Sequence, residues 1–459
     1  EVRTERRHPL TGSTREPRDR GELIARLAPE TGVFDLLARQ GALDENHLAI
    51  DPRDAAPFVV QRFDDDGLHG GSAKSADYNH RMKRTFARLL GGMSVDHFLT
   101  EYWQKKPLLV RGAIADVAVL PGREELFALA DGDRLESRLI SQAKGWQLRH
   151  GPFSARKLQR AGKPWTVLVQ GVNLVSAAGD ELMRRFRFIP YARLDDLMVS
   201  YATDGGGVGP HVDNYDVFLI QGMGQRRWRY GKQKDRRLID DLPVRILREF
   251  HPAHEALLAP GDMLYLPPEW AHDGIAVGDC MTFSVGFRAA PAQEIGEQFL
   301  NFLQDNLRLT GRYRDPNLRW QKHPAEINAT MIEQVEDMLS AIRWNRATVR
   351  DFLGATLSEP KPQVTFSPPS RPLSPARFAA AIKRHGIALD PASQLLFSGK
   401  RFYLNGERWE IPASAATWLR ELADERRAAI PKTIDAATLT ILHTAYCDGF
   451  LQPSAVAMA

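Results

Sequence analysis

The chain has 459 residues, of which 43% are hydrophobic and 26% are charged, which is enough for two or three domains with buried cores. No apolar run reaches the ~18–20 residues of a membrane span, and the charged first residues carry no apolar signal segment, so we expect a cytoplasmic protein without a membrane partner. Its two cysteines, Cys280 and Cys447, lie far apart, which argues against a disulfide scaffold or a zinc finger. The net charge of +4 is a weak signal for a ribosomal or nucleic-acid partner.

The first 81 residues differ in character from the rest of the chain. They contain no methionine, and their opening is rich in Arg, Glu, Pro and Gly, a composition typical of disorder. One interpretation is a genuine extension of unknown role. The other, which we favour, is an over-extended gene start, with the true start at Met82 or Met93. We assign no function to residues 1–81.

Regular structure is predicted from Ser94 onward, because Ser94 is a good N-cap for an amphipathic helix that ends before Pro107. The predicted elements up to the first motif are a helix, two strands, a short helix and a third strand, over residues 95–105, 108–110, 165–170, 178–186 and 193–201. In the third strand, alternation places Asp196 and Ser200 on one face and Asp195 on the other.

Residues 205–213, GGGVGPHVD, combine a glycine-rich turn with His211 and Asp213. Since alternate side chains of a strand share a face, His211 and Asp213 can point at the same place. A second stretch, PGDMLYLPPEWAHD at 260–273, reads as turn, strand, turn and then His272. Two histidines and one carboxylate form the facial triad of non-haem Fe(II) oxygenases, whereas a cupin barrel without a metal is the alternative.

The stretches GGGVGPHVDNYDVFLIQGMGQRRWR, PGDMLYLPPEWAHDG and FSVGFRAA resemble the bacterial ribosomal oxygenases, from about Ser94 to the C-terminus. The resemblance implies an α+β protein with a double-stranded β-helix (cupin, JmjC) barrel. It also implies a dioxygenase that uses Fe(II), 2-oxoglutarate and O2 to hydroxylate an arginine of the large-subunit ribosomal protein L-sixteen. The implied metal ligands are His211, Asp213 and His272.

The far carboxylate of 2-oxoglutarate needs a cation at a fixed distance from the metal, and arginine suits a bidentate contact. The basic strand at 221–229 offers Arg226, Arg227 and Arg229. The resemblance favours Arg226, and it implies that Ser200 donates a hydroxyl to the same carboxylate.

A bound substrate arginine needs a carboxylate, because a buried guanidinium without a partner is costly. Asp195 or Asp196 could supply this carboxylate, and Asp216 is a third candidate, although turn or cap roles are the ordinary explanation for such residues. Ser284, on the last predicted barrel strand at 280–289, could also face the substrate. His251 and His254 lie in a polar insertion at 232–259, and we do not expect them to bind the metal.

The expected organisation follows from these patterns. Apolar residues at helical spacing predict helices between 292 and 354, and the resemblance implies that they form a homodimer interface. Beyond a Pro/Ser-rich linker, helices and an Asn405-Gly406 hairpin turn resemble a winged helix, for which we claim no nucleic-acid binding. The expected segments are a catalytic domain, a helical region, a linker and a winged-helix-like domain, over residues 82–290, 291–357, 358–375 and 376–459.

Three rival interpretations stay open at this point. The first is a JmjC hydroxylase that acts on another protein. The second is a cupin metalloprotein without 2-oxoglutarate chemistry, which would have no need of a carboxylate anchor at Arg226. The third is a winged-helix binding protein with an inactive barrel, against which the intact ligand set argues.

Overall fold

The computed structural model describes residues 85–431 and 433–454, so the two interpretations of residues 1–81 lie outside the described residues. Helix α3 (Val95–Glu101) begins where predicted, because Ser94 Oγ accepts a hydrogen bond from the backbone N–H of His97. It ends four residues before the predicted end. There the backbone of Gln104 turns to a positive φ of 58° and its N–H donates to the hydroxyl of Tyr265, which fixes the end of the helix against the barrel.

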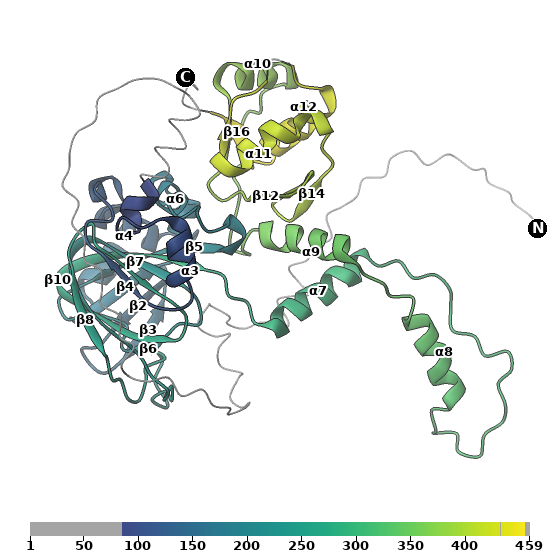
Figure 1. The fold of residues 1–459 in the computed structure, drawn as a ribbon, viewed down its shortest axis with the longest axis horizontal. Helices are drawn as coiled ribbons and strands as arrows, with labels where there is room; N and C mark the ends of the chain where they lie inside the picture. Colours follow the sequence, from purple (N-terminus) through teal and green to yellow (C-terminus); the bar gives the residue numbers. More distant parts are fainter. Residues whose placement is uncertain (1–84, 432, 455–459) are drawn as a thin grey trace, which may run out of the picture. The chain divides into compact units, whose positions relative to one another are not determined.

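A ten-stranded antiparallel sheet forms the catalytic domain and folds back on itself as a double-stranded β-helix, which confirms the predicted fold class (Figure 1). The long strands β7 and β10 pair with each other along most of their length and pass from one half of the barrel to the other. The larger half has the order β1-β9-β7-β10-β5-β4-β2-β3. In addition, β6 pairs with the start of β10, and β8 pairs with the last part of β7. The strands are β1 (Leu108–Val110), β2 (Ser137–Ser141), β3 (Gln147–His150), β4 (Trp165–Val169), β5 (Leu194–Ala202), β6 (His211–Val212), β7 (Val217–Lys232), β8 (His254–Leu258), β9 (Met263–Leu266) and β10 (Trp270–Phe287).

Two features of the barrel differ from the sequence prediction. The basic strand predicted at 221–229 is part of a longer continuous strand, β7, which begins at Val217. Gly224 has a φ of +61°, and the register of β7 against β10 shifts close to it. A Cβ on Gly224 would lie 2.2 Å from the carbonyl oxygen of Asp279, so glycine here permits a bulge. The predicted insertion at 232–259 also contains the strand β8.

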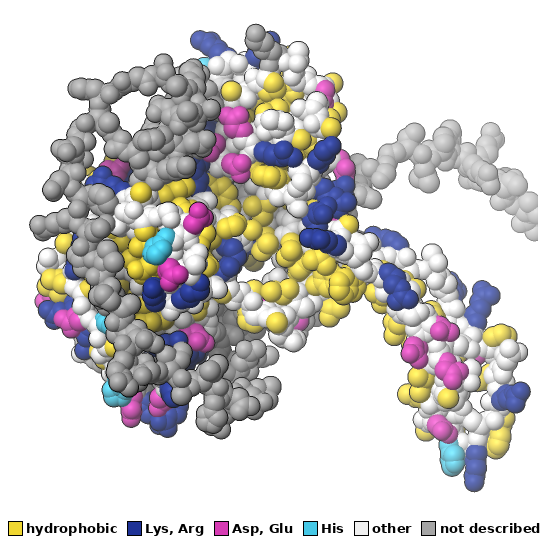
Figure 2. Space-filling view, in the orientation of Figure 1, with side chains coloured by type: hydrophobic (Ala, Val, Ile, Leu, Met, Phe, Trp, Pro, Cys, Tyr) yellow, Lys and Arg dark blue, Asp and Glu magenta, His cyan; other side chains and the backbone are white. Residues whose placement is uncertain are grey.

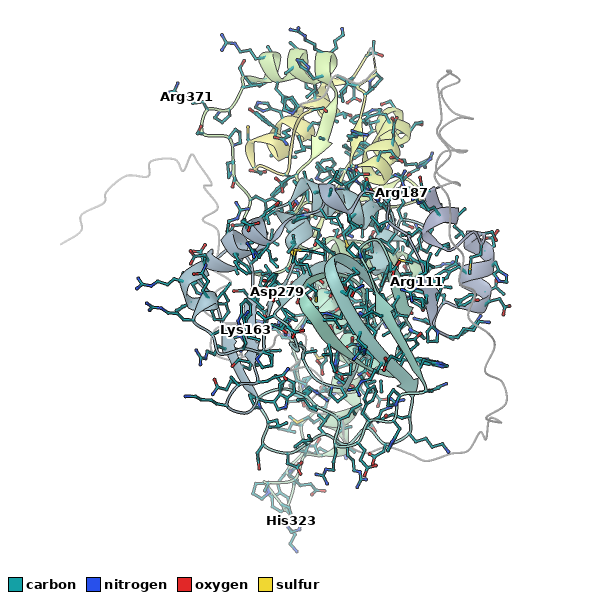
Figure 3. All side chains as sticks on the ribbon, turned by 90° about the vertical axis from the view of Figure 1, so that its left-hand side faces the viewer. Arg111, Lys163, Arg187, Asp279, His323 and Arg371 are labelled. Atoms are coloured by element: carbon teal, nitrogen blue, oxygen red, sulfur yellow. The ribbon has the colours of Figure 1, made fainter. Side chains whose placement is uncertain are left out.

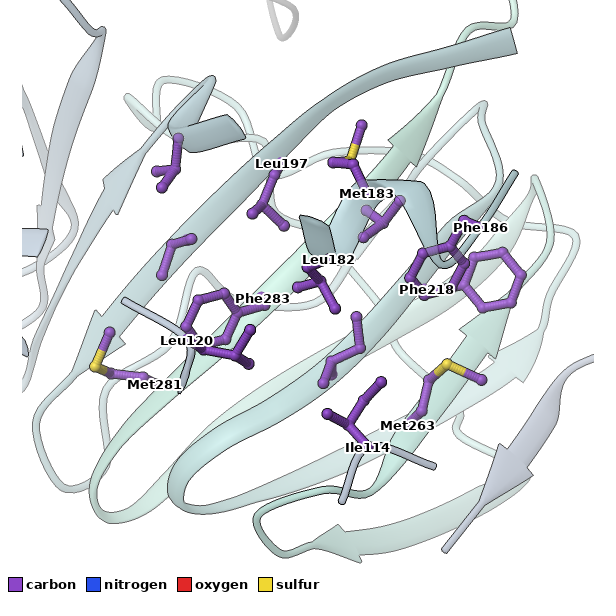
Figure 4. Close-up of a cluster of buried hydrophobic side chains, with 14 of the residues drawn as sticks. Ile114, Leu120, Leu182, Met183, Phe186, Leu197, Phe218, Met263, Met281 and Phe283 are labelled. Atoms are coloured by element: carbon purple, nitrogen blue, oxygen red, sulfur yellow. The ribbon is translucent and has the colours of Figure 1, made fainter. Parts of the chain in front are cut away.

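Apolar side chains cover both faces of the larger half of the barrel. On its outer face, Leu182 and Phe186 lie over Phe218 and Phe283 of the strands, as the close-up in Figure 4 shows. Each such side chain contributes ~1.5–3 kcal/mol when it is fully buried. A second cluster, which includes Leu219 and Trp228, lines the inner face. The helices on the outer side are α3, α4 (Arg123–Asp131), α5 (Ala155–Gln159) and α6 (Ala177–Arg184).

Three helices follow the barrel: α7 (Ala292–Asn306), α8 (Ala329–Leu339) and α9 (Arg346–Ser358). Phe352 of α9 packs on the α7 ring of Phe299 at 5.2 Å between ring centroids, whereas no residue of α8 is buried. Figure 2 shows hydrophobic side chains gathered on the surface over α7 and α9. None of the helices in the described ranges is long and apolar enough to cross a membrane.

The C-terminal domain has the predicted winged-helix pattern. Asn405 and Gly406 join β13 to β14 with φ values of 50° and 91°, as a two-residue type I′ turn requires. Helix α9 belongs to this domain by its contacts, since Asp351 accepts hydrogen bonds from Arg401 at 2.7 Å and from Tyr403 at 2.6 Å. The elements are α10 (Pro375–His385), β11 (Ile387–Leu389), β12 (Leu395–Ser398), β13 (Arg401–Leu404), β14 (Glu407–Trp409), α11 (Ala416–Glu425), β15 (Arg427–Ala428), α12 (Ala436–Cys447) and β16 (Leu451–Pro453).

Ion pairs join the winged helix to the flank of the catalytic domain. Arg426 approaches Asp180 of α6 at 3.1 Å, and Arg187 approaches Glu425 at 2.7 Å. Figure 3 labels Arg187 where the two domains meet. The end of α11 is therefore held beside α6, close to the start of β5.

Candidate metal and cosubstrate site

Three side chains that the sequence predicts as metal ligands converge on the inner face of the barrel. Strand β6 pairs with β10 so that His211 lies directly opposite His272. The potential ligand atoms of His211, Asp213 and His272 all lie within 4.8 Å of one another. The Asp213 carboxylate is 3.6 Å from Nε2 of His272 and 3.9 Å from Nε2 of His211. Two imidazoles and one carboxylate around a common point form the facial set of non-haem iron oxygenases.

Both imidazole rings are held in the tautomer that a metal requires. Nδ1 of His211 lies 2.8 Å from the carbonyl oxygen of Gly209, and Nδ1 of His272 lies 2.9 Å from that of Trp270. Because a carbonyl oxygen only accepts, each Nδ1 carries the hydrogen, which leaves the lone pair on Nε2. Such contacts orient metal ligands. Both lone pairs therefore face the Asp213 carboxylate.

The environment of His272 also favours metal binding. Its side chain is buried, and this burial lowers the pKa of His272 to about 4; the neighbouring His211 acts in the same direction and Asp213 opposes it. His272 is therefore neutral at neutral pH, and it can bind a cation without first losing a proton.

The glycine-rich turn explains how His211 comes so close to β10. A Cβ on Gly207 would lie 2.6 Å from the carbonyl oxygen of Gly274, which is on β10. A Cβ on Gly206 would lie 2.7 Å from the carbonyl oxygens of Thr203 and Trp165. These distances leave no room for any side chain, so the sequence needs glycine where the turn passes against the sheet.

Arg226 is a buried cation on the inner face of the barrel. It is 4% exposed, and its Nε and Nη2 atoms find no hydrogen-bond partner among the described residues. The guanidinium lies 5.8 Å from the ring of Trp228, which in turn lies 5.9 Å from the ring of His272. Since an unpaired buried charge is strongly unfavourable, this arrangement indicates that Arg226 binds a carboxylate of a ligand. A dicarboxylate that reaches from the metal to Arg226 fits these residues, and 2-oxoglutarate is such a molecule.

Ser200 lies on the inner face of β5. It stands opposite Thr282 in the pairing of β5 with β10, and its hydroxyl donates a long hydrogen bond of 3.4 Å to the carbonyl oxygen of Thr282. The Thr282 hydroxyl donates to Gln221 at 3.1 Å, so this wall of the barrel is polar. The contact of Ser200 with 2-oxoglutarate stays a prediction.

Asp195 and Asp196 lie together at the start of β5 and share a cation from the same chain. Nζ of Lys361 is 3.1 Å from Asp195 and 3.2 Å from Asp196. Gln170 donates a further hydrogen bond to Asp196 at 2.7 Å. Asp196 is 3% exposed, and burial raises its pKa, which Lys361 opposes. This pair is the acidic group on β5 that could receive a substrate cation.

Asp216 has a different role from the one predicted. It is fully buried, and it accepts hydrogen bonds from the hydroxyl of Tyr265 at 2.6 Å and from Gln104 at 2.9 Å. Arg193 also approaches it at 3.8 Å. These groups belong to the outer side of the barrel, where Tyr265 is part of the core, so the carboxylate ties the end of α3 to the sheet. The structure therefore does not support Asp216 as the carboxylate for a substrate arginine.

Two further polar side chains, Ser284 and Tyr215, lie on the inner face of the barrel. Ser284 is opposite Met198 of β5, and its hydroxyl makes no hydrogen bond within the described ranges. No motif in the sequence indicated Tyr215. Burial raises its pKa well above the ordinary value, and the charges of Asp213 and Asp196 raise it further, which places its ring near both carboxylates. Its position two residues after Asp213 is the signal that could have identified it.

The histidines of the predicted insertion do not join the ligand set. His251 is exposed and lies 3.3 Å from Glu249, while the ring of His254 packs against Tyr230 at 5.4 Å between centroids. In the described part of the chain, His211, Asp213 and His272 are the one group of three potential ligands that lies this close together.

The family models match both domains: the JmjC domain over residues 181–295 and the ROXA-like winged helix over residues 341–451, a range that includes α9. The ribosomal protein uL16 3-hydroxylase of Escherichia coli (strain K12) is 33% identical over 321 residues, which cover 69% of this chain and 85% of that protein. The chain belongs to the JmjC ribosomal oxygenases.

Other members of the ribosomal oxygenase family are similar too. A probable ribosomal oxygenase of Haemophilus influenzae is 34% identical over 249 residues, which cover 52% of this chain and 58% of that protein. The X-ray structure of E. coli YcfD superposes with a TM-score of 0.69 at 31% identity, covering 78% of this chain and 98% of YcfD. A structure of YcfD in complex with cobalt and 2-oxoglutarate has a TM-score of 0.66 over the same shares of the two chains.

This ribosomal oxygenase is a 2-oxoglutarate-dependent dioxygenase with Fe(II) as its metal, as predicted. Bound Fe(II) and 2-oxoglutarate activate dioxygen for insertion into a C–H bond, which side chains alone cannot do. The residues His211, Asp213 and His272 would hold the metal, and Arg226 would hold the far carboxylate of the cosubstrate. Membership of this family excludes the rival interpretations as a cupin protein without cosubstrate and as an inactive barrel.

Proposed function

We propose that this oxygenase hydroxylates an arginine side chain of the large-subunit ribosomal protein L-sixteen. The name of the E. coli relative calls this ribosomal protein uL16. The observation that carries the proposal is the pair Asp195 and Asp196 on β5, the strand that also contributes Ser200 to the inner face. A guanidinium is recognised by carboxylates, which accept its N–H groups in parallel. Because the relative is named a 3-hydroxylase, we propose the β-carbon as the position of attack.

The proposed roles follow from the places of the side chains. Asp196 binds the substrate guanidinium, and Asp195 shares the ammonium group of Lys361 with it. Ser284, whose hydroxyl is free within the described ranges, donates or accepts one hydrogen bond from the substrate. Tyr215 lies near both the acidic pair and Asp213. Together these side chains would hold the arginine stem beside the metal.

Incubation of the purified protein with Fe(II), 2-oxoglutarate and a uL16 peptide tests the proposal. Fragment mass spectra should show one added oxygen on an arginine, and a peptide with that arginine replaced by leucine should stay unmodified. The His211→Ala variant should give no product, whereas His251→Ala should behave as wild type. Oxygen on a lysine or histidine instead would keep the enzyme class and replace the substrate.

We also propose that the protein acts as a homodimer through α7 and α8. Leu300 on α7 is 65% exposed, and Ile332 and Leu339 on α8 are each 55% exposed, although all three are apolar. Exposed apolar faces of this kind mark interaction surfaces. We propose that a second copy of the chain covers these residues with the same face, because closed symmetric dimers are the commonest assemblies of soluble proteins.

We further propose that the protein works in the cytoplasm, because its proposed substrate is a ribosomal protein.

A further inference from the structure

Lys361 reaches the acidic pair of β5 from the linker between α9 and α10. Its side chain is 25% exposed, and its Nζ contacts one oxygen of each carboxylate. The lysine stands between Pro360 and Pro362, which restrict the backbone on both sides. Its carbonyl oxygen also accepts a hydrogen bond from the N–H of Val364 at 2.9 Å. Lys361 is thus presented by a stiff piece of chain.

The segment before Lys361 is anchored as well. The Ser358 hydroxyl, at the end of α9, accepts a hydrogen bond from the N–H of Gly406 at 3.0 Å. It also donates to the carbonyl oxygen of Gly354 at 2.7 Å. Lys361 therefore reaches β5 from a point that is fixed to the winged-helix hairpin.

The two oxygens of Asp196 have unequal surroundings. Oδ2 accepts hydrogen bonds from Gln170 at 2.7 Å and from Lys361 at 3.2 Å. Oδ1 accepts no hydrogen bond from any described residue. It lies 4.0 Å from where a Cβ on Gly286 would be, and the Tyr215 ring lies 3.9 Å from the same point. Since Gly286 stands between the core residues Val285 and Phe287 on β10, that point is on the inner face of the barrel.

Charges from several elements act on Asp196. Asp195 is its neighbour on β5, and Arg288, beyond the end of β10, approaches Asp195 at 3.8 Å. On the other side, Arg138 of β2 donates to Gln170 at 3.0 Å and pairs with Glu136, while Tyr215 faces the carboxylate from the β6–β7 connection. Burial raises the pKa of Asp196, Asp195 raises it further, and Lys361 and Gln170 lower it.

We propose that Lys361 and Gln170 are positioning residues that hold Asp196 by Oδ2 and keep it ionised, so that Oδ1 receives the cationic side chain of the substrate. The inference rests on the proposed arginine substrate. Lys361 and Arg288 both approach Asp195, whereas Lys361 contacts Asp196 through Oδ2. The open Oδ1 is therefore the oxygen that an incoming guanidinium can meet with a charge-assisted hydrogen bond.

The alternative role for Lys361 is that of a competitor, in which its ammonium group occupies the place of the substrate guanidinium on Asp196. The geometry favours positioning, because Lys361 uses Oδ2 and leaves Oδ1 open. Asp195 also holds the ammonium group, so Lys361 keeps a partner when a guanidinium arrives. The two roles predict opposite effects when the charge is removed.

Lys361→Met removes the charge and keeps an unbranched side chain. Peptide affinity is measured with the Mn(II)- and 2-oxoglutarate-loaded protein, using a uL16 peptide that carries arginine or its neutral analogue citrulline. We expect Lys361→Met to weaken binding of the arginine peptide about 10- to 100-fold, the size of one charge-assisted contact. Binding of the citrulline peptide should change little, and Lys361→Arg should restore most of the affinity.

The pH profile separates this role from a merely structural one. Asp196 must be ionised to bind the cation, and loss of Lys361 favours its protonated form. In Lys361→Met the acidic limb of arginine-peptide binding should therefore move to higher pH. Gln170→Leu should move it in the same direction, and Lys383→Met, which removes an exposed positive charge of α10, should leave it in place.

Tighter binding by Lys361→Met would make Lys361 a competitor and overturn the inference. Unchanged binding, or equal losses for the arginine and citrulline peptides, would overturn it too. If wild type hydroxylates the peptide while Lys361→Met binds it normally, the inference alone fails. If wild type leaves the arginine unmodified, the proposed function fails and the inference fails with it.

Discussion

Arg226 is the residue whose state in the structure most clearly requires a ligand. Its guanidinium is buried, and two of its nitrogens have no partner among the described residues. We expect Arg226→Met to weaken 2-oxoglutarate binding about 100-fold, which corresponds to roughly 3 kcal/mol for a charge-assisted pair of hydrogen bonds. The free energy of unfolding without ligand should rise, because an unpaired buried charge disappears.

The matched control is Arg227→Met on the same strand. Arg227 points to the other face of β7, where it is half exposed and lies 3.4 Å from Glu255. Titration of 2-oxoglutarate into the metal-loaded protein, followed by calorimetry, measures the affinity. Equal losses for the two variants would remove Arg226 from the cosubstrate site.

His272 gives the metal-free protein a pH-dependent stability. Burial lowers its folded pKa to about 4, below the ordinary value of 6.5. Between these values the unfolded chain binds a proton that the folded chain does not, so this contribution to stability is present above pH ~6.5 and is lost as the pH falls towards ~4. We expect a loss of ~2 kcal/mol between pH 7 and pH 5. Urea unfolding of wild type and His272→Gln measures it, and an equal pH dependence of the two proteins would contradict the assignment.

The sequence could predict the role of a residue where that role depends on residues close to it in the chain. His211 and Asp213 are two positions apart, and Arg226 follows on the next strand. Asp216 has the same local setting, but its partner Tyr265 comes from a distant strand, so its structural role was not visible. The contact of Asp196 with Lys361 joins positions 165 residues apart, and no spacing rule reaches that far.

The glycine-rich turn before β6 sets the position of the first histidine. We expect Gly207→Ala to lower stability by ~1–3 kcal/mol and to weaken metal binding, since its Cβ would meet the backbone of β10 at 2.6 Å and push β6 away. Binding of Co(II), followed by its absorption spectrum, measures the effect. Gly296→Ala, in α7 with no atom within 4 Å, is the control. Normal Co(II) affinity in Gly207→Ala would show that the close approach is not needed.

Elements with clear end signals could be predicted closely. β9 follows the Pro-Gly-Asp turn that marked its start, and α12 begins after Asp435, whose side chain accepts a hydrogen bond from the N–H of Thr438. Long strands that carry glycines could not, because the glycines of β7 look like a turn until the pairing with β10 is known. β8 was hidden for a similar reason: it is short and polar, and only its pairing with β7 makes it a strand.

The exposed apolar faces of α7 and α8 make a prediction for the whole molecule. The double variant Ile332→Asp and Leu339→Asp should convert a dimer into a monomer, because burying two unpaired carboxylates costs more than the interface can offset. Thr330→Asp, on the opposite side of α8, should remain dimeric. Light scattering after gel filtration measures the mass. A wild-type monomer, or a double variant that stays dimeric, would contradict the proposed interface.

The order of domains could be predicted because each has its own signal: the ligand motifs, the helical stripes, the Pro/Ser-rich linker and the hairpin turn. The domain to which α9 belongs could not be predicted from the sequence. Its partners Arg401 and Tyr403 lie beyond the linker, so the helix looked like part of the preceding region. The structure and the match over residues 341–451 assign it to the winged helix.

Hydroxylation of an arginine in uL16 can be tested by the intact masses of the ribosomal proteins. They should be compared between cells that carry this gene, cells that lack it, and cells in which His211→Ala replaces it. We expect uL16 alone to gain the mass of one oxygen atom, on an arginine, and only with the wild-type gene. A uL16 without added oxygen in wild-type cells, or with the same oxygen in the His211→Ala cells, would contradict it.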